Sequence, residues 1–291
     1  MFVTNKLKII FIFLGLGLII LLLNSNTHFG FRVNENEEDY ERKVFLKEST
    51  LDEDKNRIKL FYNEIFNNEY KIFSQSKEDG VIMKLLEFIN KTRNGFYVEF
   101  GTQQGLECNT RNLRENYAWK GLLMDGLYEN LSINLHKEPI LHSNILELFE
   151  KYKIDKDFDL LSEDTDYADY WIVEKILTKY RPKIVVHEVN QQGPELCVTV
   201  PKPDKLTFWD GTNFHGANVC AFWCLAKQFD YTMVYCETRG VDCFWMRNDL
   251  LKDYLKIDIN IIQNTLVPDF LFKKLNFSYP STNKQWHQIK C

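Results

Sequence analysis

The sequence predicts an α/β domain built on a doubly wound, mostly parallel sheet of seven strands, with an N-terminal transmembrane helix and a stem before it. From about residue 73, short apolar runs alternate with longer amphipathic segments, as in a parallel sheet covered by helices on both faces. An uncharged apolar run near the N-terminus predicts the helix. The 291 residues, 45% of them hydrophobic, suffice for one sizeable core, so we expect a single folded domain after the stem.

The N-terminal apolar run covers residues 9–23 and follows Lys6 and Lys8. Its fifteen residues would extend about 22 Å as a helix. A usual membrane span has roughly 20 apolar residues, so this run is shorter. A thin early secretory membrane would accept it. The preceding lysines favour a cytosolic tail over residues 1–8 and a lumenal C-terminal part. We therefore predict an uncleaved signal anchor over 9–23. The alternative is a cleaved signal peptide, which leads to the same compartment.

The features after the anchor agree with a lumenal domain. Residues 24–72 are rich in charged and amide side chains and are predicted to form a stem. Seven cysteines in an oxidising lumen should pair in part, with at least one left over. A formal net charge of −5 makes a nucleic-acid partner a poor expectation. Three glycosylation sequons begin at Asn90, Asn130 and Asn276.

The domain over residues 73–291 is predicted to alternate strands with helices. The predicted strands cover residues 96–100, 121–125, 140–142, 158–162, 183–189, 231–235 and 243–246, and the predicted helices cover 105–117, 168–180 and 213–229. In such sheets ligands bind beyond the carboxyl ends of the strands, so the residues that follow each strand are the candidates for a site.

The first strand carries the motif ExGxxxG, formed by Glu99, Gly101 and Gly105. A strand that feeds a glycine turn and then a helix lets the backbone approach a ligand. The pattern differs from the GxGxxG of nicotinamide-binding folds, and a plain strand-to-helix turn is the alternative. Asp125 ends the next strand, where an acid can accept hydrogen bonds from a ribose diol. The alternative there is an acid that caps a turn.

These segments together resemble the FkbM-like branch of class I S-adenosylmethionine-dependent methyltransferases. The resemblance implies a class I seven-stranded sheet and S-adenosylmethionine as cofactor. The sequence departs from the family pattern at Lys77, Glu163 and Tyr167, which concerns the acceptor side more than the cofactor side. The matching segments cover residues 73–80, 97–101, 121–125, 158–166, 181–190 and 234–251.

The resemblance also implies roles for individual residues. Asp125 would hold the ribose, and Asn144 would lie near the adenine. For Glu78 and Asp79 the alternative is a pair that opens a helix. The residues implied for the amino-acid end of the cofactor are Glu99, Gly101 and Gly105, and those implied to close over it are Gln75, Glu78 and Asp79.

Asp164 and Asp166 follow the fourth strand and allow three interpretations. They position the acceptor and take a proton, or they bind a divalent metal such as Mg or Mn, or they are a solvated turn. Further candidates for a base, at the end of the fifth strand, are His187 and Glu188, with His215 as another. A lone histidine is more often a structural residue.

An anchor, a stem and a globular domain form the usual layout of glycan-modifying enzymes of the Golgi. We therefore expect a single-pass type II Golgi membrane protein that methylates a sugar hydroxyl, such as that of fucose, on a glycan or glycoconjugate. One alternative is a glycosyltransferase, because Asp164-Thr165-Asp166 is a DxD pattern; another is a non-catalytic protein with this fold. The aromatics expected to stack on sugar faces are Phe208, Trp209, Phe214 and Trp245, the last being the better candidate for the core.

Overall fold

The computed structural model describes residues 8–14, 17–23, 35–190, 196–266 and 279–291, with side chains from residue 51 onward. It divides into two compact units, Met1–Leu51 and Asp52–Cys291. The second unit carries the sheet and the site.

In the first unit, a hairpin stands where the sequence predicted a helix. Strands β1 (Lys8–Leu14) and β2 (Gly17–Leu23) pair antiparallel, with Lys8 opposite Leu23. The run is rich in β-branched isoleucine and is divided by glycine, and both features disfavour a helix. No helix among the described residues has the length and apolar character needed to cross a bilayer. The membrane anchor stays a prediction.

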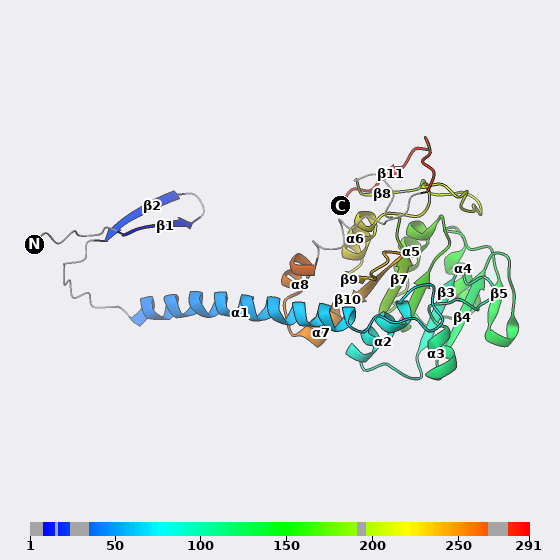
Figure 1. The fold of residues 1–291 in the computed structure, drawn as a ribbon, viewed down its shortest axis with the longest axis horizontal. Helices are drawn as coiled ribbons and strands as arrows, with labels where there is room; N and C mark the ends of the chain where they lie inside the picture. Colours follow the sequence, from blue (N-terminus) through cyan, green and yellow to red (C-terminus); the bar gives the residue numbers. More distant parts are fainter. Residues whose placement is uncertain (1–7, 15–16, 24–34, 191–195, 267–278) are drawn as a thin grey trace, which may run out of the picture. The chain divides into compact units, whose positions relative to one another are not determined.

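The second unit confirms the mostly parallel seven-stranded sheet (Figure 1). The order is β5-β4-β3-β6-β7-β10-β9, in which only β10 runs antiparallel to its neighbours. The central strands are buried on both faces, which explains why they read as continuous apolar runs. The strands are β3 (Phe96–Phe100), β4 (Lys120–Asp125), β5 (Leu135–Lys137), β6 (Leu160–Glu163), β7 (Ile184–Glu188), β9 (Tyr231–Cys236) and β10 (Asp242–Arg247).

Helices cover both faces of this sheet (Figure 1). On one face α5 contacts both α4 and α6. On the other, Phe88 of α2 packs against Phe61 of α1 and Tyr254 of α7, with ring centroids 4.8 and 4.5 Å away. The helices are α1 (Glu35–Phe66), α2 (Glu78–Phe88), α3 (Arg111–Asn116), α4 (Ile145–Lys151), α5 (Asp169–Leu177), α6 (Val219–Gln228), α7 (Asn248–Leu255) and α8 (Ile259–Leu266), with a 3-10 turn η1 (Leu131–Ile133).

Three predicted elements are displaced. The helix expected over 105–117 begins only at Arg111, and the helix expected over 213–229 begins at Val219, where Asn218 caps it by accepting the amide of Ala221 at 3.0 Å. The strand expected over 140–142 lies instead at Leu135–Lys137, because Ile140 and Leu141 line a cavity and are apolar for that reason.

The chain beyond β7 is fastened to the C-terminus. β8 (Val198–Thr199) pairs antiparallel with β11 (His287–Gln288). Disulfides join Cys197 to Cys220, Cys224 to Cys291, and Cys236 to Cys243, which leaves Cys108 as a buried free thiol. The predicted partial pairing with one cysteine left over is therefore what the structure has.

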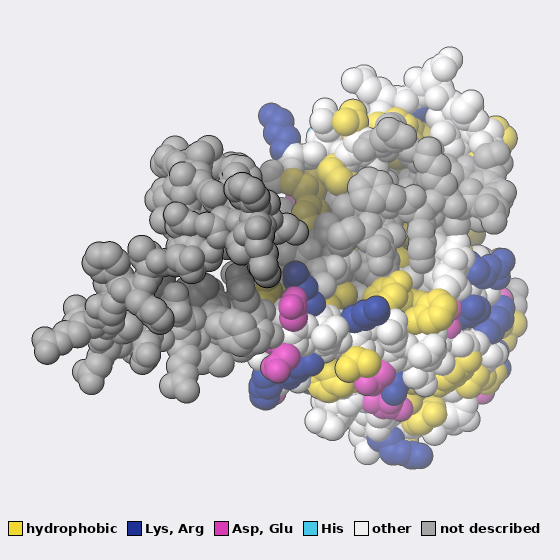
Figure 2. All heavy atoms as spheres, turned by 60° about the vertical axis from the view of Figure 1, so that its left-hand side comes forward, with side chains coloured by type: hydrophobic (Ala, Val, Ile, Leu, Met, Phe, Trp, Pro, Cys, Tyr) yellow, Lys and Arg dark blue, Asp and Glu magenta, His cyan; other side chains and the backbone are white. Residues whose placement is uncertain are grey.

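The surface carries mixed charge. On the face drawn in Figure 2, basic side chains are scattered among acidic and hydrophobic ones. Asn90 and Asn130 are exposed, as glycosylation requires, and Asn276 lies outside the described residues.

Candidate functional site

A cavity of about 690 Å³ opens beyond the carboxyl ends of β3, β4, β6 and β7. The antiparallel β10 begins at the same edge and adds Asp242 to the lining. Among the described residues that line the cavity, Lys205 is the only basic one, whereas acidic side chains come from every neighbouring strand end. The cavity is therefore suited to a ligand that carries positive charge.

The glycines of the first motif allow close contact between segments of the protein. Gly101 has φ +69°, and a Cβ there would lie 1.5 Å from the carbonyl oxygen of Asp164. Gly105 has φ +76°, and its Cβ would lie 2.4 Å from Cδ1 of Ile133. Gly101 lines the cavity, whereas Gly105 packs behind it. Both glycines are thus required by the turn itself.

Glu99 organises the loop between β3 and α3. Its carboxylate accepts the amides of Asn109 at 2.7 Å and Thr110 at 3.1 Å, together with the Thr110 hydroxyl. Burial raises the pKa of Glu99 to about 7, against the lowering effect of these donors. These hydrogen bonds hold the backbone at Asn109 and Thr110, directly before α3 begins.

Asp125 links two loops at the end of β4. One oxygen accepts the amide of Gln103 at 2.8 Å, and the other accepts those of Leu127 at 2.7 Å and Tyr128 at 3.1 Å. Asp125 still lines the cavity, beside Leu127, Tyr128 and Ile140. A carboxylate offers about four lone-pair sites, so one remains for a hydroxyl. An acid beside an apolar wall is the arrangement that a nucleoside needs.

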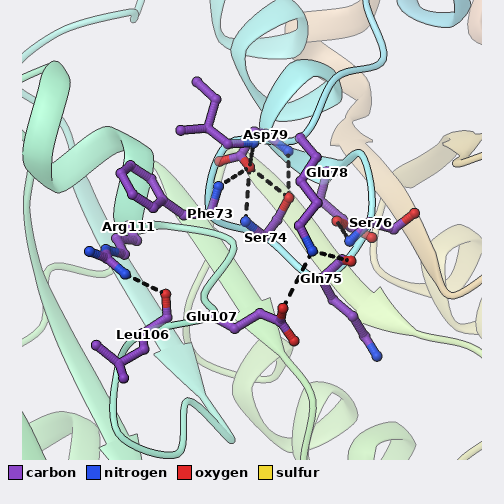
Figure 3. A network of polar contacts seen from close by, with 11 residues as sticks. Phe73, Ser74, Gln75, Ser76, Glu78, Asp79, Leu106, Glu107 and Arg111 are labelled. Atoms are coloured by element: carbon purple, nitrogen blue, oxygen red, sulfur yellow. Dashed lines mark hydrogen bonds and ion pairs between the residues drawn. The ribbon is translucent and has the colours of Figure 1, made fainter.

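The segment before α2 is held by two buried acids (Figure 3). Asp79 accepts the amides of Ile72, Phe73 and Ser74 at 2.7, 2.8 and 2.9 Å. Glu78 opens α2 and is fully buried. Neither side chain is among the described residues that line the cavity, so both fit the alternative of a pair that opens a helix.

Gln75 does line the cavity, and its segment is fastened to the glycine loop (Figure 3). Lys71 donates to the carbonyl of Gln75 at 2.9 Å and pairs with Glu107 at 3.4 Å. The Arg111 guanidinium lies 4.2 Å from the ring centroid of Phe73. The N-terminal segment and the loop after β3 therefore form one wall.

Asn144, predicted near the adenine, instead fixes a turn. Its side chain accepts the amide of Leu141 at 3.0 Å and donates to the carbonyl of Pro139 at 2.7 Å. It does not appear among the described lining residues. The apolar contacts on this side come from Ile140 and Leu141.

Three carboxylates converge in the cavity where β6 and β7 end. Asp164, Asp166 and Glu188 each bring an oxygen within 4.8 Å of the others. Asp166 has φ +63°, in the left-handed region that Asp adopts more readily than most non-glycine residues. Burial, followed by the charges of Asp169 and Asp125, raises the pKa of Asp166 to about 6. Burial, followed by the charge of Asp164, also raises the pKa of Glu188.

Two further acids, Glu163 and Asp169, hold the turn that carries Asp164 and Asp166, and the sequence analysis assigned them no role in the site. The Thr165 amide donates to Asp169 at 2.8 Å, and the Thr165 hydroxyl donates to Glu163 at 2.9 Å. Glu163 and Asp169 are buried. Glu163 is thus part of the support for the turn. Asp242 was also missed, since only the antiparallel direction of β10 brings it to this edge.

The two candidate histidines differ in their surroundings. His187 is fully buried, its ring 3.8 Å from that of Phe222 and 4.8 Å from that of Trp245. Burial lowers its pKa to about 3, so it is a neutral core residue and is not positioned as a base. His215 lies nearer the site, with Nδ1 3.8 Å from a carboxylate oxygen of Glu188.

The aromatics also divide between core and cavity. Trp245 is fully buried, as expected, and Phe214 is also buried. Phe208 and Trp209 line the cavity. Tyr279 lines it too and was missed, because it lies far from the other site residues in sequence.

No protein-family model matches the chain, and no curated protein matches it. Among solved structures it is similar to a Klebsiella pneumoniae protein described as an O-methyltransferase, with 14% identity and a TM-score of 0.36 over 64% of this chain and 90% of that chain. It is also similar to an S-adenosylmethionine-dependent methyltransferase from Geobacter sulfurreducens in complex with S-adenosylhomocysteine. There the identity is 12% and the TM-score 0.31, over 60% of this chain and 72% of that chain.

A further similar structure is the MycE methyltransferase of the mycinamycin biosynthetic pathway, in complex with Mg and S-adenosylhomocysteine. The identity is 11% and the TM-score 0.30, over 60% of this chain and 54% of that chain.

Proposed function

We propose that the protein is an S-adenosylmethionine-dependent O-methyltransferase. The observation that supports this most is that one cavity joins the nucleoside-type corner at Asp125 to the carboxylates of Asp164, Asp166 and Glu188. A cationic sulfonium cofactor suits a cavity with this excess of acidic lining. S-adenosylmethionine, when bound, supplies an activated methyl group, so the protein mainly has to align the acceptor and accept its proton.

The proton acceptor is assigned to Asp166 or Glu188. Both line the cavity, and both have raised pKa values, which makes them better bases than an ordinary carboxylate. His215 lies next to Glu188, with Nδ1 3.8 Å from its carboxylate.

The same carboxylates fit a divalent cation. Oδ1 of Asp164 is buried without a hydrogen-bond partner, and the three carboxylates lie within reach of one ion. Carboxylate oxygens are the ligands that Mg²⁺ and Mn²⁺ prefer. Asp164, Asp166 and Glu188 would hold such an ion, which would lower the pKa of an acceptor hydroxyl and so replace the carboxylate base.

We further propose that the acceptor is a sugar hydroxyl on a glycan or glycoconjugate, and that the domain works in the Golgi lumen behind a type II anchor over 9–23. Three disulfides support an oxidising compartment. The exposed Asn90 and Asn130 are compatible with glycosylation there. Aromatic side chains beside the carboxylates support a sugar acceptor.

The first test is calorimetric titration of the protein over residues 52–291 with S-adenosylmethionine and S-adenosylhomocysteine, alongside Asp125→Ala. We expect micromolar binding that weakens at least about tenfold in the variant, because the variant loses both a ribose acceptor and the link between two loops. Asp155→Ala, an exposed acid at a turn, is the matched control. Saturable binding that is equal in all three proteins would contradict the role of Asp125.

A glycosyltransferase is the second candidate, because the carboxylates of Asp164 and Asp166 do converge as a metal-binding DxD would require. Titration with nucleotide sugars and Mn²⁺ separates the two. Nucleotide-sugar binding without S-adenosylhomocysteine binding would replace the methyltransferase proposal.

A further inference from the structure

The C-terminal segment, residues 279–291, reaches the cavity from the far end of the chain. Tyr279 lines the cavity, and its ring centroid lies 4.7 Å from that of Trp209, with the planes 75° apart. Burial and then the negative charges of Glu188 and Asp166 raise the pKa of Tyr279, in agreement with a phenol close to both carboxylates. The centroids of the Trp209 and Tyr279 rings lie 5.2 and 5.9 Å from that of His215, whose Nδ1 is 3.8 Å from a carboxylate oxygen of Glu188. Both aromatic rings therefore lie near a group that would take the acceptor's proton.

Several independent contacts hold this segment in place. Its β11 pairs with β8, and the amide of Asn213 donates to the carbonyl of Pro280 at 3.0 Å. Trp286 packs edge-on against Phe214 at 4.8 Å between ring centroids. The last residue, Cys291, is bonded to Cys224 on α6. The segment is thus clamped to the loop that carries Trp209.

We propose that Trp209 and Tyr279 form the wall against which the acceptor ring lies, so that the disulfide-bound C-terminal segment determines acceptor specificity. This inference rests on the methyltransferase function proposed above. A pyranose ring has one face rich in C–H groups, which packs on aromatic rings, and hydroxyls along its edge. With its C–H face on this wall, the ring would direct a hydroxyl toward Asp166 and Glu188.

The site has a cofactor half, around Asp125 and Gln75, and an acceptor half, around Trp209 and Tyr279, and different segments of the chain form them. The cofactor half depends on the loops around Asp125 and on Gln75, none of which contains a residue of the C-terminal segment. Loosening the segment should therefore weaken acceptor binding and leave cofactor binding intact.

The test measures acceptor binding and cofactor binding separately, on the protein over residues 52–291. Binding of methyl α-L-fucopyranoside, methyl β-D-galactopyranoside and methyl α-D-mannopyranoside is followed by saturation-transfer NMR, and binding of S-adenosylhomocysteine by calorimetry. In Tyr279→Ala we expect glycoside affinity to fall about tenfold and S-adenosylhomocysteine affinity to stay within about twofold. Trp209→Ala should behave in the same way, and Tyr279→Phe should show a smaller loss because the ring remains.

Two of the disulfides offer a matched pair of variants. Cys224→Ser/Cys291→Ser releases the segment and should weaken glycoside binding, whereas Cys236→Ser/Cys243→Ser removes a disulfide between β9 and β10 and should not. Unchanged glycoside binding in both Tyr279→Ala and Cys224→Ser/Cys291→Ser would overturn the inference. Loss of S-adenosylhomocysteine binding in Tyr279→Ala would also overturn it, by placing Tyr279 in the cofactor half.

Failure of the proposed function has a different signature. It would show as absent S-adenosylhomocysteine binding in the unmodified protein, whatever the glycosides do. If none of the three glycosides binds the unmodified protein, the assignment of the wall to a pyranose ring is wrong.

Discussion

At the scale of single residues, the site is defined by charge that the protein does not neutralise. Asp164, Asp166, Glu188 and Asp242 face one cavity whose only described basic lining residue is Lys205. Buried carboxylates without a cation are costly, because burial removes their hydration and they repel one another; both effects raise the pKa values of Glu188 and Asp242. A cationic ligand would relieve this repulsion, which is the physical reason to expect a sulfonium cofactor, a divalent ion or both.

The cation prediction can be tested without activity. Titration with Mn²⁺, followed by thermal unfolding, should raise the melting temperature of the unmodified protein, because an ion that binds only the folded state stabilises it. Asp166→Asn and Glu188→Gln should weaken Mn²⁺ binding by at least about tenfold, whereas the exposed-turn variant Asp155→Asn should not. Equal Mn²⁺ effects in all four proteins would assign the ion to another place.

Glu99 gives a prediction about pH. Its pKa is about 7 in the folded protein against 4.5 ordinarily, so the unfolded chain loses this proton first as the pH rises. The unmodified protein therefore loses stability from this group between pH 4.5 and about 7, by at most about 3 kcal/mol at 1.36 kcal/mol per pKa unit. The side chain of Glu99→Gln cannot titrate. Its amide group would face the donors of Asn109 and Thr110, which lowers the free energy of unfolding by about 1–3 kcal/mol.

The measurement is urea unfolding of both proteins at several pH values from 4.5 to 8. We expect Glu99→Gln to be less stable at pH 4.5 and the difference to narrow as the pH rises. His187 and His215 are present in both proteins, so their titration cancels in this comparison. A difference that stays constant or widens would show that Glu99 is already ionised at low pH in the folded protein.

At the scale of elements, the site depends on how closely the ends of β3 and β6 approach. Gly101→Ala would place a Cβ 1.5 Å from the Asp164 carbonyl, in a backbone conformation with φ +69°. Gly211 has φ +80°, but a Cβ added there would meet no atom within 4 Å, so Gly211→Ala controls for the conformation alone. We expect about 1–2 kcal/mol of destabilisation in the control and more than about 3 kcal/mol in Gly101→Ala. Similar losses in urea unfolding would mean that steric contact at Gly101 is unimportant.

The elements also show what sequence can and cannot predict. The strands that end at Phe100 and Asp125 were predicted to within a residue because their apolar runs are continuous and end at a glycine or an acid. Ile140 and Leu141 looked like a strand because cavity walls are apolar too. Asp242 was missed because strand direction depends on tertiary pairing with Glu188, which no local pattern records. Tyr279 was missed for the same kind of reason, since only the β8–β11 pairing and a disulfide bring it to the site.

At the scale of the whole molecule, the disulfides join distant parts of the chain in unequal ways. Cys224–Cys291 spans 67 residues and ties the C-terminus to α6, whereas Cys236–Cys243 spans 7 residues within one hairpin. In the chain-entropy description, a cross-link stabilises more when it closes a longer loop of the unfolded chain. The first should therefore contribute about 4 kcal/mol and the second about 2.5 kcal/mol.

We predict from this that Cys224→Ser/Cys291→Ser loses more unfolding free energy in urea than Cys236→Ser/Cys243→Ser. The first variant also frees β11, so its urea dependence should become shallower if the segment from 279 to 291 detaches before the sheet unfolds. The order would reverse if the packing of Trp286 on Phe214 and the β8–β11 pairing fail to hold the C-terminus without the bond, because the segment would then gain freedom in the folded protein too and offset the loss. Comparing the two variants thus shows whether the acceptor wall is held by covalent connection or by packing.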